Sequence, residues 1–404
     1  MLRPHARLAI LLSVTLLLIA PIAAYGASGR PPAEGLGAGP PVADVVAGPS
    51  HITADAAVLI DAVTGRVLWS RASTEARAPA STTKMMTALV ALEQGVPDAV
   101  VTVSRRAAAT PGSSAHVRAG DRYTLAELLE AMLLRSGNDA AVAIAEHIAG
   151  SVPAFAALMN RRAAALGLTE THFVNPHGLT EAFHFSSAYD LALIARAGLA
   201  LPSFARIVRR AEGELHGEDA QQRLIQRALT NTNRLLFTYG WVDGVKTGTT
   251  SAAGNCLVAS GTRGGMRLIA VVLHSDDRWG DAVRLLDWGF THFSYLRPVR
   301  ADQIVRRIVV AGARRGAWLP VRAGGTLAVP VSLEELPRVR VRVRLDAALH
   351  APVRQGQTVG YALVLVGGTP LAAVPLVAAR SVPAAPWPLR WWDALWRARR
   401  APGG

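Results

Sequence analysis

Apolar residues recur at regular spacings along the middle of the chain, and these spacings predict its secondary structure. Residues 56–69 alternate on either side of a polar segment in which Gly65 favours a turn, so we expect a β-hairpin. Helical spacing of apolar residues predicts helices at 80–93, 125–134, 139–149 and 153–166. The pattern then changes to strands at 245–249, 256–261 and 267–273, followed by a helix at 281–293.

Strands at both ends of a helical middle predict an α+β fold, in which an antiparallel sheet with flanking helices joins the first strands to the last. We place this domain at residues 51–295. Further along the chain, residues 300–376 contain short β-branched runs separated by turn signals such as Gly324-Gly325, which predict a small all-β domain.

The N-terminus has the pattern of a secretory signal peptide. Basic residues precede an apolar run at 8–24, and small residues follow it, so we assign residues 1–27 to the signal. An uncleaved membrane anchor is the alternative. Residues 28–50 are rich in Gly, Pro and Ala and are expected to form a linker. The protein is therefore expected outside the cytoplasm, at the outer face of the cell membrane.

The C-terminal stretch 377–404 is assigned to a linker and a membrane-anchor segment. Tryptophans alternate with arginines there, as is typical of an amphipathic helix in a membrane interface. The alternative is a tryptophan-rich helix that docks on the β domain. The tryptophans are Trp387, Trp391, Trp392 and Trp396.

The formal net charge of +14 favours an anionic partner, either nucleic acid, an acidic membrane leaflet or an anionic wall polymer. Export argues against nucleic acid. The arginines between 338 and 344 alternate with valines, which indicates a half-exposed strand. Cys256 is the only cysteine, so the chain forms no internal disulfide, and its apolar neighbours indicate a buried position.

The basic residues are almost all arginine, because only two of the 43 are lysine, namely Lys84 and Lys246. Lysine loses its proton when it is desolvated or placed near another cation, whereas a guanidinium stays charged. We therefore expect at least one of the two lysines to act as a general base.

Three short motifs combine these lysines with hydroxyl and amide groups. Ser81 and Lys84 are three residues apart, which on a helix brings hydroxyl and amine to one face, so that the amine can activate the serine. Ser136-Gly137-Asn138 lies between two predicted helices and offers a hydroxyl and an amide. Lys246-Thr247-Gly248 lies on a predicted strand and offers a cation and a hydroxyl to a substrate carboxylate.

The order of these motifs resembles that of the penicillin-binding and serine β-lactamase superfamily. The resemblance is strongest to the low-molecular-weight penicillin-binding proteins that are serine-type D-alanyl-D-alanine carboxypeptidases of the peptidase S11 type. It includes the segments 79–87, 136–141 and 243–248, together with Asn175-Pro176-His177-Gly178-Leu179 and Asn231-Thr232-Asn233-Arg234-Leu235-Leu236. It covers residues 52–295 closely and 300–375 more loosely.

The resemblance implies removal of the terminal D-alanine from peptidoglycan stem peptides through an acyl-enzyme on Ser81, covalent inhibition by β-lactams, and roles in wall synthesis and cell shape. It assigns Lys84 as the base and Ser136 as a proton relay. The implied substrate-binding residues are Asn138, Lys246, Thr247, Gly248 and Thr249, with the backbone amides of Ser81 and Thr249 as oxyanion donors. No cofactor is implied.

Three other functions agree less well with the sequence. A β-lactamase would need a second base for deacylation, but Gly137 stands where one class has aspartate, and no matching glutamate motif follows. A non-catalytic wall-binding protein would not need all three motifs. The histidines lack the spacing of a helical metal site, so a metal hydrolase is not expected.

Overall fold

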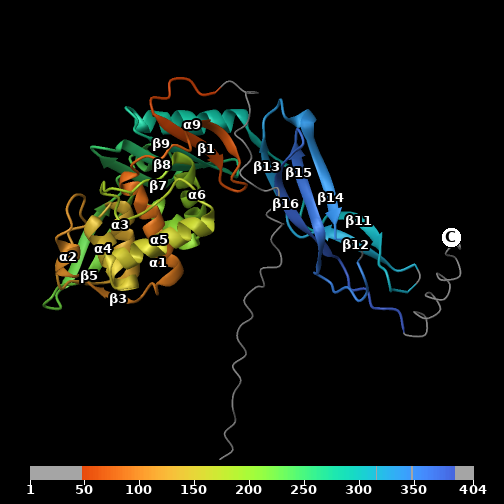
Figure 1. Cartoon of the computed structure of the whole chain (residues 1–404), viewed down its shortest axis with the longest axis horizontal. Coiled ribbons are helices and arrows are strands. Elements are labelled where there is room, and N and C mark those ends of the chain that lie inside the picture. The colour runs from red at the N-terminus through yellow and green to blue at the C-terminus, as the bar shows by residue number, and fades with distance from the viewer. Residues whose placement is uncertain (1–47, 315, 347–348, 387–404) are drawn as a thin grey trace, which may run out of the picture.

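The computed structural model describes residues 48–314, 316–346 and 349–386 (Figure 1). The predicted signal segment and most of the linker, at the N-terminus, lie outside the described residues. So does the tryptophan-rich segment that begins at Trp387.

The central sheet of the first domain joins the two ends of that domain, as the sequence predicted. It consists of β1 (Ala56–Asp61), β2 (Val67–Arg71), β7 (Val242–Thr250), β8 (Gly254–Arg263) and β9 (Met266–Leu273). The strands are antiparallel in the order β2-β1-β9-β8-β7. The predicted hairpin is confirmed, with Gly65 at φ +76° in its turn. This sheet and the helices on both of its faces confirm the predicted α+β fold.

Alternation along β1 and β9 separates the two faces of this sheet. Val58 and Ile60 pack into the larger core, whereas Ala57 and Leu59 pack into a second core beneath α9 (Arg278–His292). All four side chains are fully buried, which explains why β1 reads as a continuous apolar run. Figure 1 shows α9 lying along one face of the sheet and α6 (Ala188–Leu199) on the other.

The helical middle of the domain agrees closely with the apolar spacing. The helices predicted near 125–134, 139–149 and 153–166 are α3 (Leu125–Leu134), α4 (Asn138–Ala149) and α5 (Val152–Leu166). The structure adds α2 (Arg105–Ala108), α7 (Pro202–Val208), α8 (Leu235–Thr238) and a sheet in the order β3-β4-β5-β6 (Val100–Thr102, Arg122–Thr124, Glu212–Glu218, Leu224–Thr230). The polar, charged hairpin β5–β6 has little apolar alternation, which is why its sequence pattern predicted no strands.

The C-terminal domain is all-β, as predicted. A five-stranded sheet has the order β11-β12-β16-β15-β14, and a two-stranded sheet pairs β10 with β13. A short 3₁₀ helix, η2 (Leu336–Arg338), precedes β14. The strands are β10 (Ser294–Val299), β11 (Ile304–Val309), β12 (Trp318–Ala323), β13 (Leu327–Val331), β14 (Val339–Leu345), β15 (Thr358–Val366) and β16 (Thr369–Ala378). The arginine–valine alternation is β14, an edge strand, as expected for a half-exposed strand.

Buried polar contacts join the two domains at the β1–β2 turn. The Arg66 guanidinium forms an ion pair with Glu335 and donates to Pro330 O. Both charged side chains are less than a tenth exposed. Tyr295, on the first strand of the β domain, donates its hydroxyl proton to Asp61 over 2.6 Å. The β domain is therefore anchored on the side of the first domain where β1 turns into β2.

Among the described residues, no single helix is both long and apolar enough to cross a membrane. Two pairs of consecutive helices, α4 with α5 and α6 with α7, are long and apolar enough when each pair is taken together, but each pair is sharply bent.

Candidate active site

Ser81 lies in a tight turn that precedes the first long helix. The helix expected from residue 80 begins as a 3₁₀ turn, η1 (Ala80–Thr83), and continues as α1 (Lys84–Gln94). Thr82 explains this start, because its hydroxyl donates to Pro79 O over 2.6 Å and closes the turn. The structure retains the contact that the spacing predicted: Lys84 Nζ lies 2.8 Å from Ser81 Oγ.

The Lys84 amine has three close oxygen neighbours. Besides Ser81 Oγ, they are Asn138 Oδ1 at 2.7 Å and His177 O at 2.8 Å. The last two can only accept. His177 O is a backbone carbonyl oxygen, and the Asn138 amide is oriented by its Nδ2, which donates to Pro111 O and leaves Oδ1 toward Lys84. A neutral amine has two protons and one lone pair, so it can donate to both acceptors and direct its lone pair at the serine hydroxyl. The geometry fits a base for Ser81.

The surroundings of Lys84 favour this neutral form. The side chain is fully buried, and desolvation lowers its pKa well below the ordinary value for lysine. The positive charge of Lys246 lowers the pKa further, while the Asp139 carboxylate opposes both effects. The second lysine of the chain thus helps to deprotonate the first.

The segment 175–179 builds the wall that faces Lys84. Asn175 Oδ1 accepts from the backbone N–H groups of His177 and Gly178, and its Nδ2 donates to Leu179 O. This loop presents His177 O to Lys84. Gly178 is at φ +90°, and a Cβ there would lie 1.8 Å from Ala80 O, so only glycine permits the loop to pack against the Ser81 turn.

Ser136 and Asn138 occupy the junction between α3 and α4. Ser136 is 4% exposed and has the left-handed φ of +62°, a conformation that serine adopts at a cost and that is common at functional sites. In the described part of the chain its hydroxyl has no hydrogen-bond partner. Asn138 contacts Lys84 directly, whereas no direct bond joins Ser136 to either residue of the Ser81–Lys84 pair.

Asp139 fixes the loop opposite this junction. Its buried carboxylate accepts from the backbone N–H groups of Ala115 and Val117 and from the Ser114 hydroxyl. The same loop supplies Pro111 O, which holds the Asn138 amide. The motif Ser136-Gly137-Asn138 is therefore positioned by a carboxylate that follows it immediately.

The strand β7 places Lys246, Thr247 and Gly248 beside the Ser81 turn. A Cβ on Gly248 would lie 3.1 Å from Ser81 N and 3.0 Å from Ala80 Cβ, so glycine allows the strand backbone to approach Ser81. Thr247 Oγ1 lies 2.7 Å from Thr232 Oγ1. Asn233 Nδ2 donates to Gly244 O, which ties the segment 231–236 to the same strand.

Lys246 is buried without a carboxylate partner among the described residues. Its only hydrogen bond there is to Thr247 O at 3.2 Å. Desolvation, together with the Arg278 cation, lowers the pKa of Lys246 to about 7. This region of the site lacks negative charge, so it favours a ligand that brings an anion.

Arg278, which the motifs did not reveal, completes this region. Its Nη1 donates to Thr249 Oγ1 over 2.8 Å and to Gly248 O over 3.1 Å. It is the first residue of α9, far from β7 in the sequence. The sequence has one signal that bears on Arg278. Asp277 is a helix-capping residue shortly after β9, so it indicates that a helix begins at Arg278.

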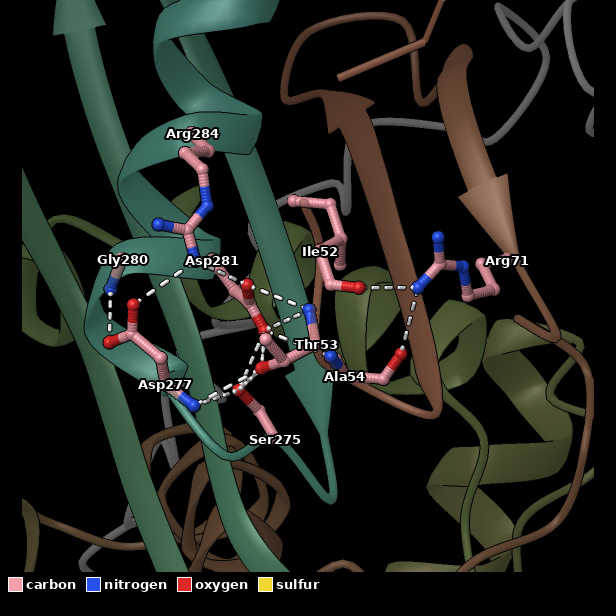
Figure 2. A network of polar contacts seen from close by, with 9 residues as sticks. All are labelled: Ile52, Thr53, Ala54, Arg71, Ser275, Asp277, Gly280, Asp281 and Arg284. Carbon is pink, nitrogen blue, oxygen red and sulfur yellow. Dashed lines mark hydrogen bonds and ion pairs between the residues drawn. The ribbon is translucent and has the colours of Figure 1, made fainter. Parts of the chain in front are cut away.

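The buried carboxylate of Asp281, about one helical turn after Arg278, fixes the start of α9 (Figure 2). Asp281 accepts from Thr53 N and Ala54 N and from the Ser275 hydroxyl. Asp277 caps the helix by accepting from Gly280 N. The helix start, and with it the backbone of Arg278, is therefore tied to the segment that enters β1.

Two buried histidines on the side of Lys84 and Thr83 favour the neutral form at neutral pH. Burial lowers the pKa of His177 to about 3 and that of His184 to about 4. His184 Nδ1 accepts from Val174 N, so the ring proton is on Nε2. His184 Nε2 lies 2.9 Å from Thr83 Oγ1 and donates to it. Within the described ranges, no three metal-ligating side chains are grouped so that they could hold an ion.

The match to known families agrees with this geometry. Residues 43–277 match the D-alanyl-D-alanine carboxypeptidase family of peptidase S11 type, and residues 293–384 match the C-terminal domain of penicillin-binding protein 5. The chain belongs to the D-alanyl-D-alanine carboxypeptidase family. It is a serine-type D-Ala-D-Ala carboxypeptidase, a hydrolase. The predicted resemblance is confirmed.

Relatives cover most of the chain. The D-alanyl-D-alanine carboxypeptidase DacF of Bacillus subtilis is 37% identical over 80% of this chain and 85% of its own length. The crystal structure of penicillin-binding protein 5 from Haemophilus influenzae is 32% identical, with a TM-score of 0.69 over 84% of this chain and all of that one. The Streptomyces K15 DD-transpeptidase is 34% identical, with a TM-score of 0.59 over 61% of this chain and all of that one.

Proposed function

We propose that this carboxypeptidase acts through a covalent acyl-enzyme on Ser81. The observation that supports it most directly is the arrangement around Lys84, a buried amine with two acceptors and one hydroxyl at hydrogen-bond distance. Because burial lowers its pKa, the amine gives up its proton more readily than an exposed lysine does, as a base for Ser81 requires. Arginine could not serve in this position.

In the proposed acylation, Ser81 Oγ forms a bond to the carbonyl carbon between the two terminal D-alanines and its proton passes to Lys84 Nζ. The C–N bond then breaks as Ser136 Oγ gives its proton to the leaving amine and takes up in exchange the proton held by Lys84 Nζ. D-Alanine departs, and Lys84 is neutral again. A water molecule then attacks the ester and gives one proton to Lys84, which passes it to the Ser81 oxygen as the ester bond breaks and the shortened stem peptide leaves.

The backbone amides of Ser81 and Thr249 are proposed to stabilise the oxyanion. Gly248 supports this role, because its missing side chain lets β7 approach Ser81 N closely. Asn138 is proposed to hold the substrate amide. Since its side chain already bonds Lys84 and Pro111 O, substrate binding would have to exchange one of these bonds.

The terminal carboxylate of the substrate is proposed to bind Lys246, Thr247 and Thr249, with Arg278 beside them. Lys246 is buried and Arg278 half-buried, and neither has a carboxylate partner among the described residues, which supports this proposal. An incoming carboxylate would favour the charged form of Lys246 and raise its pKa from about 7. A β-lactam has a carboxylate and a strained carbonyl, so we expect it to acylate Ser81 covalently.

The biological setting follows from the substrate. We propose that the protein is exported, acts at the outer face of the cell membrane, and trims stem peptides during wall synthesis, with effects on cell shape. The membrane surface would be reached through the C-terminal segment. The sequence patterns at both ends support this setting.

The proposal is tested by supplying the purified enzyme with a stem pentapeptide and measuring free D-alanine, in parallel with Ser81→Ala. Release by the wild type alone supports Ser81 as nucleophile, and equal release by both proteins refutes it. Labelled penicillin separates the rival activities, because a persistent adduct supports the carboxypeptidase mechanism, whereas rapid turnover of the drug would indicate a β-lactamase.

A further inference from the structure

The positive charge of the protein is concentrated in the β domain. Residues 294–386 contain 13 arginines and four carboxylates, whereas residues 48–293 contain 23 lysines and arginines and 22 carboxylates. The catalytic domain is thus nearly neutral. A surplus of this size creates an electrostatic potential around the domain that bears it, and this domain does not contain the active site.

Three loops form the end of the β domain that lies away from the catalytic domain, here called the distal tip: residues 310–317, 349–357 and 379–386. Backbone bridges join them, since Ala351 N donates to Ala311 O and Val382 N donates to Val353 O, each over 2.8 Å. None of the three contains an acidic residue. Each contains at least one arginine, and the exposed ones described are Arg314, Arg354 and Arg380.

An exposed aromatic group adjoins this tip. Trp318, the first residue of β12, is 40% exposed. The Arg307 guanidinium lies 4.8 Å from the centre of its ring, and that of Arg380 lies 4.9 Å away. Val309, paired with Trp318 across β11 and β12, is 79% exposed. Apolar and cationic groups therefore meet on one surface, with no carboxylate in the adjoining loops.

The chain leaves the described structure at this same tip. Ala385 N donates to Gly312 O over 2.8 Å, which fixes the last described residues against the first of the three loops. The next 18 residues contain four tryptophans, four arginines and one aspartate. A segment of this composition suits the interface of an anionic membrane. The last described residues before it lie against the loop 310–317, which contains Arg314.

We propose that the distal tip of the β domain itself docks on the anionic surface of a lipid bilayer, in addition to the segment that follows it. Arg307, Arg314, Arg354 and Arg380 would contact lipid phosphates, while Trp318 and Val309 reach the boundary of the acyl chains. Two contacts joined in this way restrict the rotation of the β domain and hold the catalytic domain at a fixed distance from the membrane.

The test uses the full chain and sedimentation with vesicles, either of phosphatidylglycerol mixed with phosphatidylcholine or of phosphatidylcholine alone. The tip variant combines Arg307→Gln with Arg380→Gln. A basic residue near an anionic surface contributes about 1 kcal/mol, so we expect binding to the mixed vesicles to weaken about 30-fold. Val309→Gln, at a position exposed enough to leave folding intact, should weaken it several-fold.

The matched control combines Arg340→Gln with Arg342→Gln, which removes the same charge from β14. Arg340 lies near the η2 end of that strand and Arg342 at its middle, and screening limits their effect on a surface beyond the other end. The control should bind vesicles within about threefold of the wild type.

Three results would overturn the proposal: equal weakening by the tip and control variants, no weakening by the tip variant, or the same weakening on phosphatidylcholine alone. A tip variant that loses binding to soluble polyphosphate yet binds vesicles normally would show that the tip recognises a soluble polyanion, and would also refute it. Release of D-alanine from a soluble pentapeptide should be unchanged in every variant, which separates this question from the proposed mechanism.

Discussion

The two domains use cationic side chains in opposite ways. In the catalytic domain, both lysines of the chain are buried side by side, and each one's pKa is lowered by burial and by a neighbouring cation. In the β domain every basic residue other than histidine is arginine, and those described in the loops of the distal tip, Arg314, Arg354 and Arg380, are exposed. If the two proposals hold, the identity of the cation matters where a proton has to move, and only its charge matters where a surface is to be attracted.

The sharpest way to break this comparison is to exchange lysine and arginine in both domains. Lys84→Arg keeps the charge but cannot accept the Ser81 proton, so we expect acylation by penicillin to fall by about 10³-fold or more. The reciprocal Arg340→Lys in β14 should leave acylation unchanged. Stopped-flow measurement of penicillin acylation checks both. Retained acylation in Lys84→Arg would mean that another group is the base.

The buried carboxylate at the start of α9 should matter far more for stability than a surface carboxylate of the β domain. Asp281→Ala leaves the amides of Thr53 and Ala54 without their acceptor, and we expect the free energy of unfolding to fall by about 2–4 kcal/mol.

The matched change is Asp302→Ala, whose exposed ion pair with Arg322 should contribute less than about 1 kcal/mol. Urea titration of the full chain measures both changes. Similar losses in the two variants would show that the network in Figure 2 is not a principal support of this region.

Arg278→Gln tests whether the cation that lies against Thr249 binds the substrate carboxylate. We expect kcat/KM for a stem pentapeptide to fall about 10- to 100-fold, chiefly through KM, because one charge-assisted contact is lost. The same peptide with an amidated C-terminus should be equally poor for wild type and variant. Arg300→Gln in the β domain serves as control, and a comparable loss there would contradict the assignment.

The pH dependence should distinguish the roles of the two lysines. Lys84 must be neutral to accept a proton, so kcat/KM should fall, by about tenfold per pH unit, as pH drops below its lowered pKa. Lys246 must be charged to attract a carboxylate, so kcat/KM should fall again as pH rises above about 7. Lys246→Arg should remove only the alkaline decline. A decline that persists in that variant would assign it to another group.

Local spacing was sufficient to predict most of this architecture. The Ser81–Lys84 contact, the bounds of α3 and the strands around Lys246 follow from residues that are near in the sequence. The β5–β6 hairpin was missed, because its charged strands are stabilised by pairing and by Tyr123 rather than by their own apolar alternation.

The partners that tune the site could not be predicted, because they come from distant segments. His177 O reaches Lys84 across 93 residues, and Arg278 reaches Thr249 across 29. Neither contact leaves a local pattern. The resemblance included the segment around His177, but its role as a carbonyl acceptor for Lys84 is evident only from the folded chain.

The most direct test of the central claim is the mass of the intact protein and of its peptides after brief exposure to benzylpenicillin. We expect one added drug molecule, located on the peptide that contains Ser81, in the wild type and in the Arg340→Lys variant, and almost none in Lys84→Arg. An adduct on another residue, or full labelling of Lys84→Arg, would contradict the claim.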